Sequence, residues 1–233
     1  MKLKALLLSC TLALALAAPA FANGTDEILL GFTGMDYQSP NPSGVYLDLG
    51  EGYNQVGFVT SFGPLLTPWV DTSLYQYTIH TFGLTVNGRF FTSPFLTVTF
   101  NNNGRSRYYR DALSGGTPGT YGINPPNATS PSTFIDGSMR VGGDVDNFVL
   151  TYDFSINDGN FSGDMTLDEG PDLIYVPAGQ RAGWVLGGIN NHGLPNNPSV
   201  PAGYDHQVEG ECRIPGKTPT THKTWGAVKA LYR

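Results

Sequence analysis

Hydrophobic and polar positions alternate most regularly between residues 148 and 167. The apolar members of the first half are Phe148, Leu150, Tyr152, Phe154 and Ile156, and those of the second half are Phe161, Gly163, Met165 and Leu167. A period of two residues on each side of the Asp158-Gly159 pair predicts a β-hairpin with a two-residue turn. That register places Tyr152 opposite Met165 on the apolar face of the hairpin.

Shorter runs rich in β-branched and aromatic residues predict further strands. They lie at 45–49, 56–59, 75–79, 84–86, 89–91, 96–100, 107–109, 173–176 and 184–186. Asn87-Gly88 is typical of a tight hairpin turn, and the segment 101–104 is typical of a second one. Many short strands joined by such turns predict an all-β fold, either an antiparallel β-sandwich or an open barrel.

The composition supports this fold class. The 233 residues include 30 glycines and 17 prolines, and charged residues make up only 14%. Long helices are disfavoured in such a chain, and a charge content well below the usual value of about 25% excludes a coiled coil or a charge-rich disordered chain. Hydrophobic residues make up 40%, which is enough for a packed core.

The first 22 residues have the features of a bacterial-type signal peptide. Lys2 and Lys4 precede an apolar run from 5 to 18, and Ala20-Phe21-Ala22 offers a cleavage site before Asn23. We therefore predict a signal peptide at 1–22, a β-domain at 23–212 and a basic linker and tail at 213–233. The expected location is secreted, periplasmic or at the cell surface. No later stretch has the length of a membrane anchor, so none is expected in the mature chain.

Charge separates the domain from its tail. All 19 acidic residues lie between Asp26 and Glu211, a span that holds six arginines and no lysine, for a formal charge of −13. Such a body repels nucleic acid and anionic membranes, and no nucleic-acid partner is expected. The segment 213–233 carries five basic residues and no acid, and its end fits a short helix. It could serve as a sorting signal, a membrane-surface helix, a lid or a contact with a partner chain, or it could be a frayed terminus.

Familiar catalytic motifs are absent from the sequence. There is no Gly-x-Ser-x-Gly, no phosphate-binding glycine loop and no His-Glu-x-x-His. Once the predicted signal peptide is removed, Cys212 is the single cysteine, and we expect it to be buried and unpaired. The four histidines are scattered along the chain, and each is expected at the surface or in a loop rather than as a ligand.

The predicted hairpin suggests a metal site. Its register places Asp153 directly opposite Asp164, and like charges in that position destabilise a ladder. Solvent can screen them, an arginine can lie beside them, or a bound Ca²⁺ can bridge them. Asp144 and Asp146 could then supply further ligands. No other cofactor is expected.

Two further segments concentrate polar groups. Arg105, Arg107 and Arg110 interleave with Tyr108 and Tyr109, a pattern that could bind an anionic glycan, with Arg107 and Tyr109 as the candidate ligand-binding residues. The alternative is a polar strand face that pairs with acidic neighbours. In the segment 204–212, a strand would place Asp205, Glu209 and Glu211 on one face and His206, Val208 and Cys212 on the other.

Together these patterns favour an exported extracellular or cell-envelope protein without identifiable catalytic machinery. Its role would be structural, surface-assembling or glycan-binding, with a glycan or an envelope component as the partner. The alternative is a secreted hydrolase that acts on polysaccharides through a carboxylate pair. A cleft with two facing carboxylates beside Trp69 or Trp184 would favour the enzyme.

Overall fold

The computed structural model describes residues 27–39, 44–122, 132–191 and 200–214. The strands of this part are β1 (Glu27–Gln38), β2 (Gly52–Phe62), β3 (Tyr75–Thr92), β4 (Phe95–Phe100), β5 (Gly104–Ala112), β6 (Ser138–Asp153), β7 (Asp158–Glu169), β8 (Trp184–Asn191) and β9 (His206–Ile214). Short 3₁₀ turns connect some of them: η1 (Thr67–Trp69), η3 (Ser132–Phe134), η4 (Pro171–Tyr175) and η5 (Ala178–Gln180). The predicted signal peptide and the predicted tail helix lie outside the described residues.

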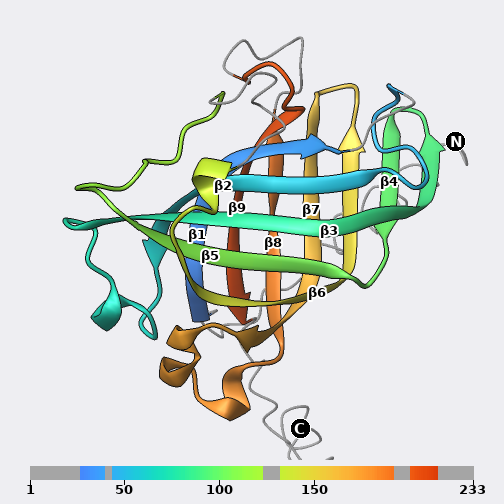
Figure 1. Cartoon of the computed structure of the whole chain (residues 1–233). Coiled ribbons are helices and arrows are strands. Elements are labelled where there is room, and N and C mark those ends of the chain that lie inside the picture. The colour runs from blue at the N-terminus through green and yellow to red at the C-terminus, as the bar shows by residue number, and fades with distance from the viewer. Residues whose placement is uncertain (1–26, 40–43, 123–131, 192–199, 215–233) are drawn as a thin grey trace, which may run out of the picture. The chain divides into compact units, whose positions relative to one another are not determined.

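All the strands except β4 close into an eight-stranded antiparallel barrel. The order around the barrel is β1, β2, β3, β5, β6, β7, β8 and β9, and β9 pairs again with β1. The wall of β2, β3 and β5 runs across the wall of β7, β8 and β9 (Figure 1). The all-β antiparallel prediction is confirmed, but the sheet is neither a sandwich nor an open barrel. Register shifts in several ladders bend the strands, and closure leaves the barrel wall without unpaired edges.

Strand β4 shows why two predicted hairpins are wrong. Asn87-Gly88 lies inside the continuous strand β3, where the β3–β4 register shifts between Val86 and Gly88. The Asn-Gly pair therefore forms an irregularity in a strand rather than a turn between strands. The second predicted hairpin, with its turn at 101–104, would pair β4 with β5. Instead β4 pairs with the end of β3 and with the end of β6, whereas β5 pairs with other parts of the same two strands.

Strands β6 and β7 form the strongest predicted hairpin, but in a different register. The turn occupies 154–157, so Tyr152 pairs with Gly159 and not with Met165, which pairs with Val145. The cause is local. The backbone N–H and the hydroxyl of Ser155 both donate to the Asp153 carboxylate, and this closes the turn before Asp158-Gly159. An irregularity between Asp146 and Val149 shifts the rest of the ladder.

Two predicted strands are not strands. The segment 45–49 forms turns, in which Leu47 is fully buried and has a φ of +52°. The segment 173–176 belongs mostly to η4, which starts at Pro171. A proline at the start of a 3₁₀ turn has no N–H to lose, whereas in a strand it would lack a ladder donor.

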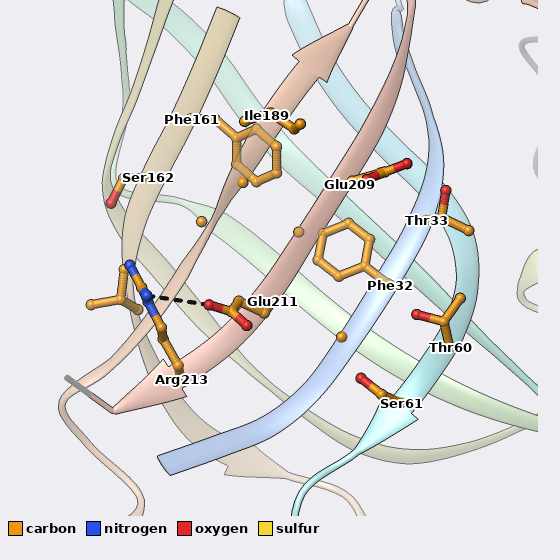
Figure 2. A pocket seen from close by; sticks show the side chains of 15 residues that line it. Phe32, Thr33, Thr60, Ser61, Phe161, Ser162, Ile189, Glu209, Glu211 and Arg213 are labelled. Atoms are coloured by element: carbon orange, nitrogen blue, oxygen red, sulfur yellow. Dashed lines mark ion pairs between the residues drawn. The ribbon is translucent and has the colours of Figure 1, made fainter. Parts of the chain in front are cut away.

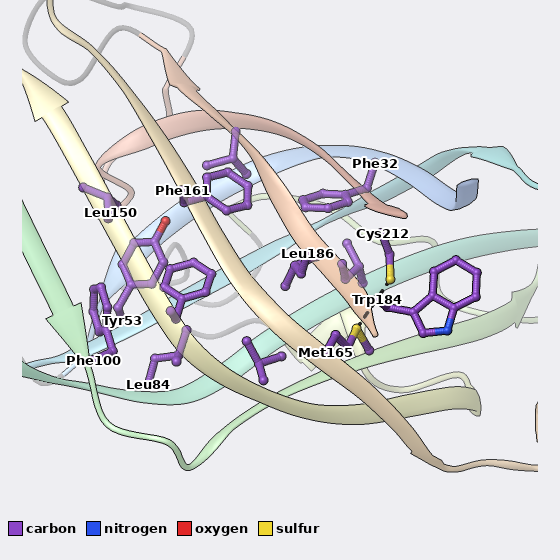
Figure 3. Close-up of a cluster of buried hydrophobic side chains, with 14 of the residues drawn as sticks. Phe32, Tyr53, Leu84, Phe100, Leu150, Phe161, Met165, Trp184, Leu186 and Cys212 are labelled. Atoms are coloured by element: carbon purple, nitrogen blue, oxygen red, sulfur yellow. Dashed lines mark hydrogen bonds between the residues drawn. The ribbon is translucent and has the colours of Figure 1, made fainter. Parts of the chain in front are cut away.

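The alternating apolar side chains fill the barrel, as Figure 3 shows for Trp184, Met165 and Cys212. Cys212 is buried and unpaired, as predicted, and its thiol donates to the Met165 sulfur over 3.6 Å. Trp184 is fully buried, and its indole N–H donates to the Gln180 carbonyl over 2.6 Å. The interior is therefore occupied by packed side chains.

One inward-facing row explains how the wall around β8 and β9 is built. Phe161 of β7, Gly188 of β8, Gly210 of β9 and Phe32 of β1 are successive cross-strand partners. A Cβ on Gly188 or Gly210 would lie within 3 Å of a phenylalanine ring atom. The two rings, with centroids 6.5 Å apart, thus occupy the space that the glycines leave inside the barrel.

Candidate functional site

A groove of about 830 Å³ lies on the outer face of β7, β8, β9, β1 and β2 (Figure 2). Its centre is a second cross-strand row, formed by Ser61, Gly31, Glu211, Gly187 and Ser162. In this row the Glu211 carboxylate has a glycine on each side and a serine beyond each glycine. The row therefore presents one acid and two hydroxyls with little steric cover.

The alternation along β9 places Glu211 in the groove. His206, Val208 and Cys212 are buried, whereas Glu209 and Glu211 face outward, as the sequence predicted. Asp205, predicted to share the outward face, precedes the strand, and its carboxylate accepts the Gln38 side-chain amide over 3.0 Å. The glycines lower the groove floor because neither carries a Cβ. A Cβ on Gly187 would lie 3.3 Å from the Phe161 carbonyl oxygen, a tight contact, so this position accommodates little more than a glycine beside the groove. A ligand can therefore approach the strand backbone closely at this point.

Other side chains complete the groove with mixed polarity. Glu209 has Thr33 and Ile189 as its neighbours in the adjacent strands. Arg213 forms an ion pair with Glu211 over 3.2 Å, seen as a dashed line in Figure 2. Hydroxyls, carboxylates, a guanidinium and short apolar side chains thus share one surface, as suits a ligand with many hydroxyl groups.

The two glutamates do not form the cleft expected for a hydrolase. They are two residues apart on one strand, so their Cβ atoms are separated by about 7 Å, which lies within the range of a glycosidase pair. They stand side by side on one wall, however, and do not face each other across a cleft. Trp184 is buried in the core and Trp69 stacks on Tyr175, and neither lines the groove.

The structure does not bring Asp153 and Asp164 together. Asp164 lies opposite Asp146, and its carboxylate accepts the Asn147 side-chain amide over 2.8 Å. Asp153 lies opposite Asp158. The register on which the calcium prediction rested is therefore wrong. Within the described residues, no group of three or more His, Cys, Asp or Glu side chains is placed to hold a metal ion.

The arginine-rich segment in β5 is a paired strand face. Arg107 contacts both oxygens of Glu169, at 2.7 and 3.1 Å, and Arg105 binds Asp144 and Asp168. Arg107 also lies 5.1 Å from the centre of the Phe82 ring. Tyr109 is buried. For Arg105 and Arg107 the alternative of pairing with acidic neighbours is confirmed, whereas Arg110 lies 4.3 Å from the centre of the Tyr75 ring.

A second polar cluster lies inside the barrel, on the inner face of the strands that carry the groove. Its centre is Asp36 of β1, a fully buried carboxylate. One oxygen accepts the His206 backbone N–H over 2.7 Å and contacts His206 Nδ1 over 3.1 Å. The other accepts the Tyr53 hydroxyl over 3.0 Å and the Asn190 amide over 2.6 Å. Asp36, Tyr53, Asn190 and His206 form what we term the Asp36 network.

The surroundings of Asp36 shift the pKa values of its neighbours. Burial raises the pKa of Tyr53 well above its ordinary value, so the phenol stays protonated and donates to Asp36. Burial lowers the pKa of His206, but the Asp36 carboxylate and the charge of Asp205 together more than offset this, and the net pKa is raised. Burial and the charge of Asp36 raise the pKa of Asp205 from 3.8 to about 6.

These shifts predict that Asp205 and His206 contribute less to stability as the pH rises, whereas His80, whose pKa burial lowers to about 4, acts in the opposite direction. Asp205 has a higher pKa in the folded chain than its ordinary value of 3.8, so its protonated form favours the folded state. This contribution to stability is complete below pH 3.8 and is lost as the pH rises through about 6. His206 acts in the same direction, because its raised pKa favours the folded state below its ordinary value of 6.5. We expect Asp205→Asn to raise the free energy of unfolding at pH 8 by about 2 kcal/mol and to change little at pH 3.5.

Urea unfolding of both chains at several pH values measures this effect. The matched control is Asp136→Asn, because Asp136 is exposed and lies far along the chain from the Asp36 network. Equal stability of wild type and Asp205→Asn at pH 8 would contradict a raised pKa at Asp205.

Sequence reasoning missed the Asp36 network. His206 was expected at the surface or in a loop, but it is 5% exposed and lies against Asp36, 170 residues earlier in the chain. A signal for Asp36 did exist, since it follows Leu30, Phe32 and Gly34 at alternate positions, on the inward face of β1. A carboxylate at a core position indicates a partner, but the partner's identity required the fold.

Comparison with known protein families, with curated proteins and with solved structures finds no match to this chain. Among the described residues, no helix has the length and apolar character needed to cross a membrane.

Proposed function

We propose that the protein is an exported, non-enzymatic binding protein that holds a neutral glycan in the outer groove. The observation that carries this proposal is the row in which Glu211 stands between Gly31 and Gly187, with a serine on either side. The Glu211 carboxylate, although ion-paired with Arg213, has lone pairs left to accept hydrogen bonds from sugar hydroxyls. The serine hydroxyls both donate and accept, as a sugar ring requires.

Charge and shape narrow the ligand class. The span from Asp26 to Glu211 carries a formal charge of −13, which disfavours an anionic glycan. Val185 and Ile189 offer apolar contacts for the C–H faces of a sugar ring. The open groove suits an extended oligosaccharide rather than an enclosed small molecule. The predicted export to the cell surface or the periplasm would bring the protein to such ligands.

A panel of neutral oligosaccharides built from hexoses, pentoses or N-acetylhexosamines tests the proposal by isothermal titration calorimetry. We expect Glu211→Gln to weaken binding about 10-fold, the equivalent of one charge-assisted hydrogen bond. Gly187→Val should weaken it at least as much, because the added side chain occupies the groove floor. The matched control is Gly179→Val, since a Cβ at Gly179 would meet no atom within 4 Å.

Two outcomes would contradict the proposal. The first is that no neutral oligosaccharide binds the wild-type chain, and the second is that Gly187→Val binds as tightly as Gly179→Val. Release of shorter sugars during incubation, abolished by Glu209→Gln or Glu211→Gln, would support the hydrolase alternative. The spacing of these two glutamates is the observation that favours that alternative.

A further inference from the structure

Five exposed apolar side chains, four of them aromatic, gather at one end of the barrel, outside the groove. They are Phe90, Phe91 and Phe95 on the β3–β4 hairpin, and Phe154 and Ile156 on the β6–β7 turn, and we term them the aromatic tip. Each is between 42% and 68% exposed. The hairpin continues β3 beyond the part of the strand that pairs with β5 (Figure 1).

Contacts join the two segments of the aromatic tip. The Phe154 backbone N–H donates to the Pro94 carbonyl over 3.0 Å, and the Phe91 and Phe154 ring centroids are 6.0 Å apart. Phe95 is the cross-strand partner of Asp153, which directly precedes Phe154. The tip is therefore one continuous surface, and none of its residues lines the groove.

The aromatic tip exposes its side chains on both faces of one hairpin. Phe90 and Phe91 are consecutive in a strand, so they point to opposite faces. Phe91 pairs with the buried Leu96, whereas Phe90 pairs with Thr97 on the other face. A partner with a flat surface could cover only one of these faces. A medium that surrounds the hairpin covers both.

The exposed apolar area of the aromatic tip helps to decide between a protein partner and a lipid surface. The exposed fractions correspond to about 550 Å² of apolar side chain, taking about 200 Å² for each residue. This is at the upper end of the largest patches on monomers, yet well below the ~800 Å² per partner of a stable protein interface. A second copy of this chain is therefore a poorer occupant than a lipid surface.

We infer that the aromatic tip is a membrane-contact site that inserts into the interface of a zwitterionic lipid bilayer. The segment from Phe90 to Gly104 carries no charged residue, so it can enter the interface without desolvating a charge. Asp153 and Asp158 face each other in the ladder at the base of the tip. Their carboxylates and the aromatic rings complement the cationic amine of a choline headgroup, whereas the acidic body disfavours anionic lipid.

Flotation of the full chain with phosphatidylcholine vesicles tests this inference. The triple variant Phe90→Ser/Phe91→Ser/Phe95→Ser should lower the bound fraction at least 10-fold. The matched control is Leu49→Ser/Leu74→Ser/Ile174→Ser, which removes three large apolar side chains of comparable exposure outside the tip. Circular dichroism and thermal melts establish that each variant is folded. Comparing variants of the same chain cancels any contribution from the residues that all of them share.

A second measurement does not depend on removing apolar surface. Phe90→Trp places an indole at the tip, and brominated phosphatidylcholine should quench its added fluorescence. Leu74→Trp, at an exposed position outside the tip, should escape quenching. The inference is overturned by equal vesicle binding of the two triple variants, by no binding of the wild-type chain, by stronger binding to phosphatidylglycerol vesicles, or by tip-dependent self-association in sedimentation. Glycan binding is measured independently of all these outcomes.

Discussion

Replacing Asp36 with alanine should lower the free energy of unfolding by about 3–5 kcal/mol at pH 7. The carboxylate accepts the Tyr53 hydroxyl, the Asn190 amide and the His206 backbone N–H, and all these groups are buried. Without it, each donor keeps its desolvation cost and loses its acceptor. Urea unfolding monitored by circular dichroism measures the loss.

Two further variants make this prediction specific to the Asp36 network. Asp36→Asn keeps the side-chain shape but brings an amide donor toward groups that already donate, so we expect an intermediate loss. Asp136→Ala removes an exposed aspartate and should change the free energy of unfolding by less than about 0.5 kcal/mol. A loss at Asp36→Ala no larger than that at Asp136→Ala would show that the network contributes nothing to stability.

The Asp36 network and the groove share the strands β1, β2, β8 and β9. The inward positions of β1, β8 and β9 carry Asp36, Asn190 and His206, and the outward positions of these strands carry residues of the groove. Asp36 and His206 are also direct cross-strand partners of β1 and β9. The buried carboxylate therefore holds together the strands whose outer faces would bind a ligand.

The sequence revealed which faces of the strands are apolar, but it did not reveal how the strands meet. Alternation correctly placed Leu150, Phe161 and Met165 on the buried side of the β6–β7 hairpin. The register failed because Ser155 and Asp153 close the turn early and the ladder shifts near Asn147. Neither event changes the period of two. Closure of the barrel was missed for a similar reason, since the pairing of β9 with β1 joins segments almost a full chain apart.

The same limit applies to the candidate site. The outward direction of Glu209 and Glu211 followed from alternation within one segment. The groove did not, because its shape depends on Gly31 and Gly187, which flank Glu211 from two other strands. From the sequence alone, a glycine within a strand indicates only local destabilisation of the strand. That it leaves room for a ligand can be recognised only when its cross-strand neighbours are known.

Trp184→Ala should be as damaging as the loss of Asp36, with a decrease of about 3–5 kcal/mol in the free energy of unfolding. Trp184 is the largest of the fully buried side chains in the described residues, and it lies opposite Met165 in the β7–β8 ladder. Alanine would leave a cavity in a closed barrel, whose paired walls limit collapse around it. It would also leave the Gln180 carbonyl without the indole donor.

The matched comparison is Trp69→Ala, because Trp69 is 53% exposed and stacks on Tyr175 at the surface. Its loss should cost no more than about 1.5 kcal/mol, the value of an aromatic pair beyond its buried area. Trp184→Phe keeps most of the buried volume and should fall between the two alanine variants. A similar cost for Trp69→Ala and Trp184→Ala in urea unfolding would mean that the barrel interior adjusts freely. Packing around Trp184 would then not determine the position of β8 or of the groove residues that β8 carries.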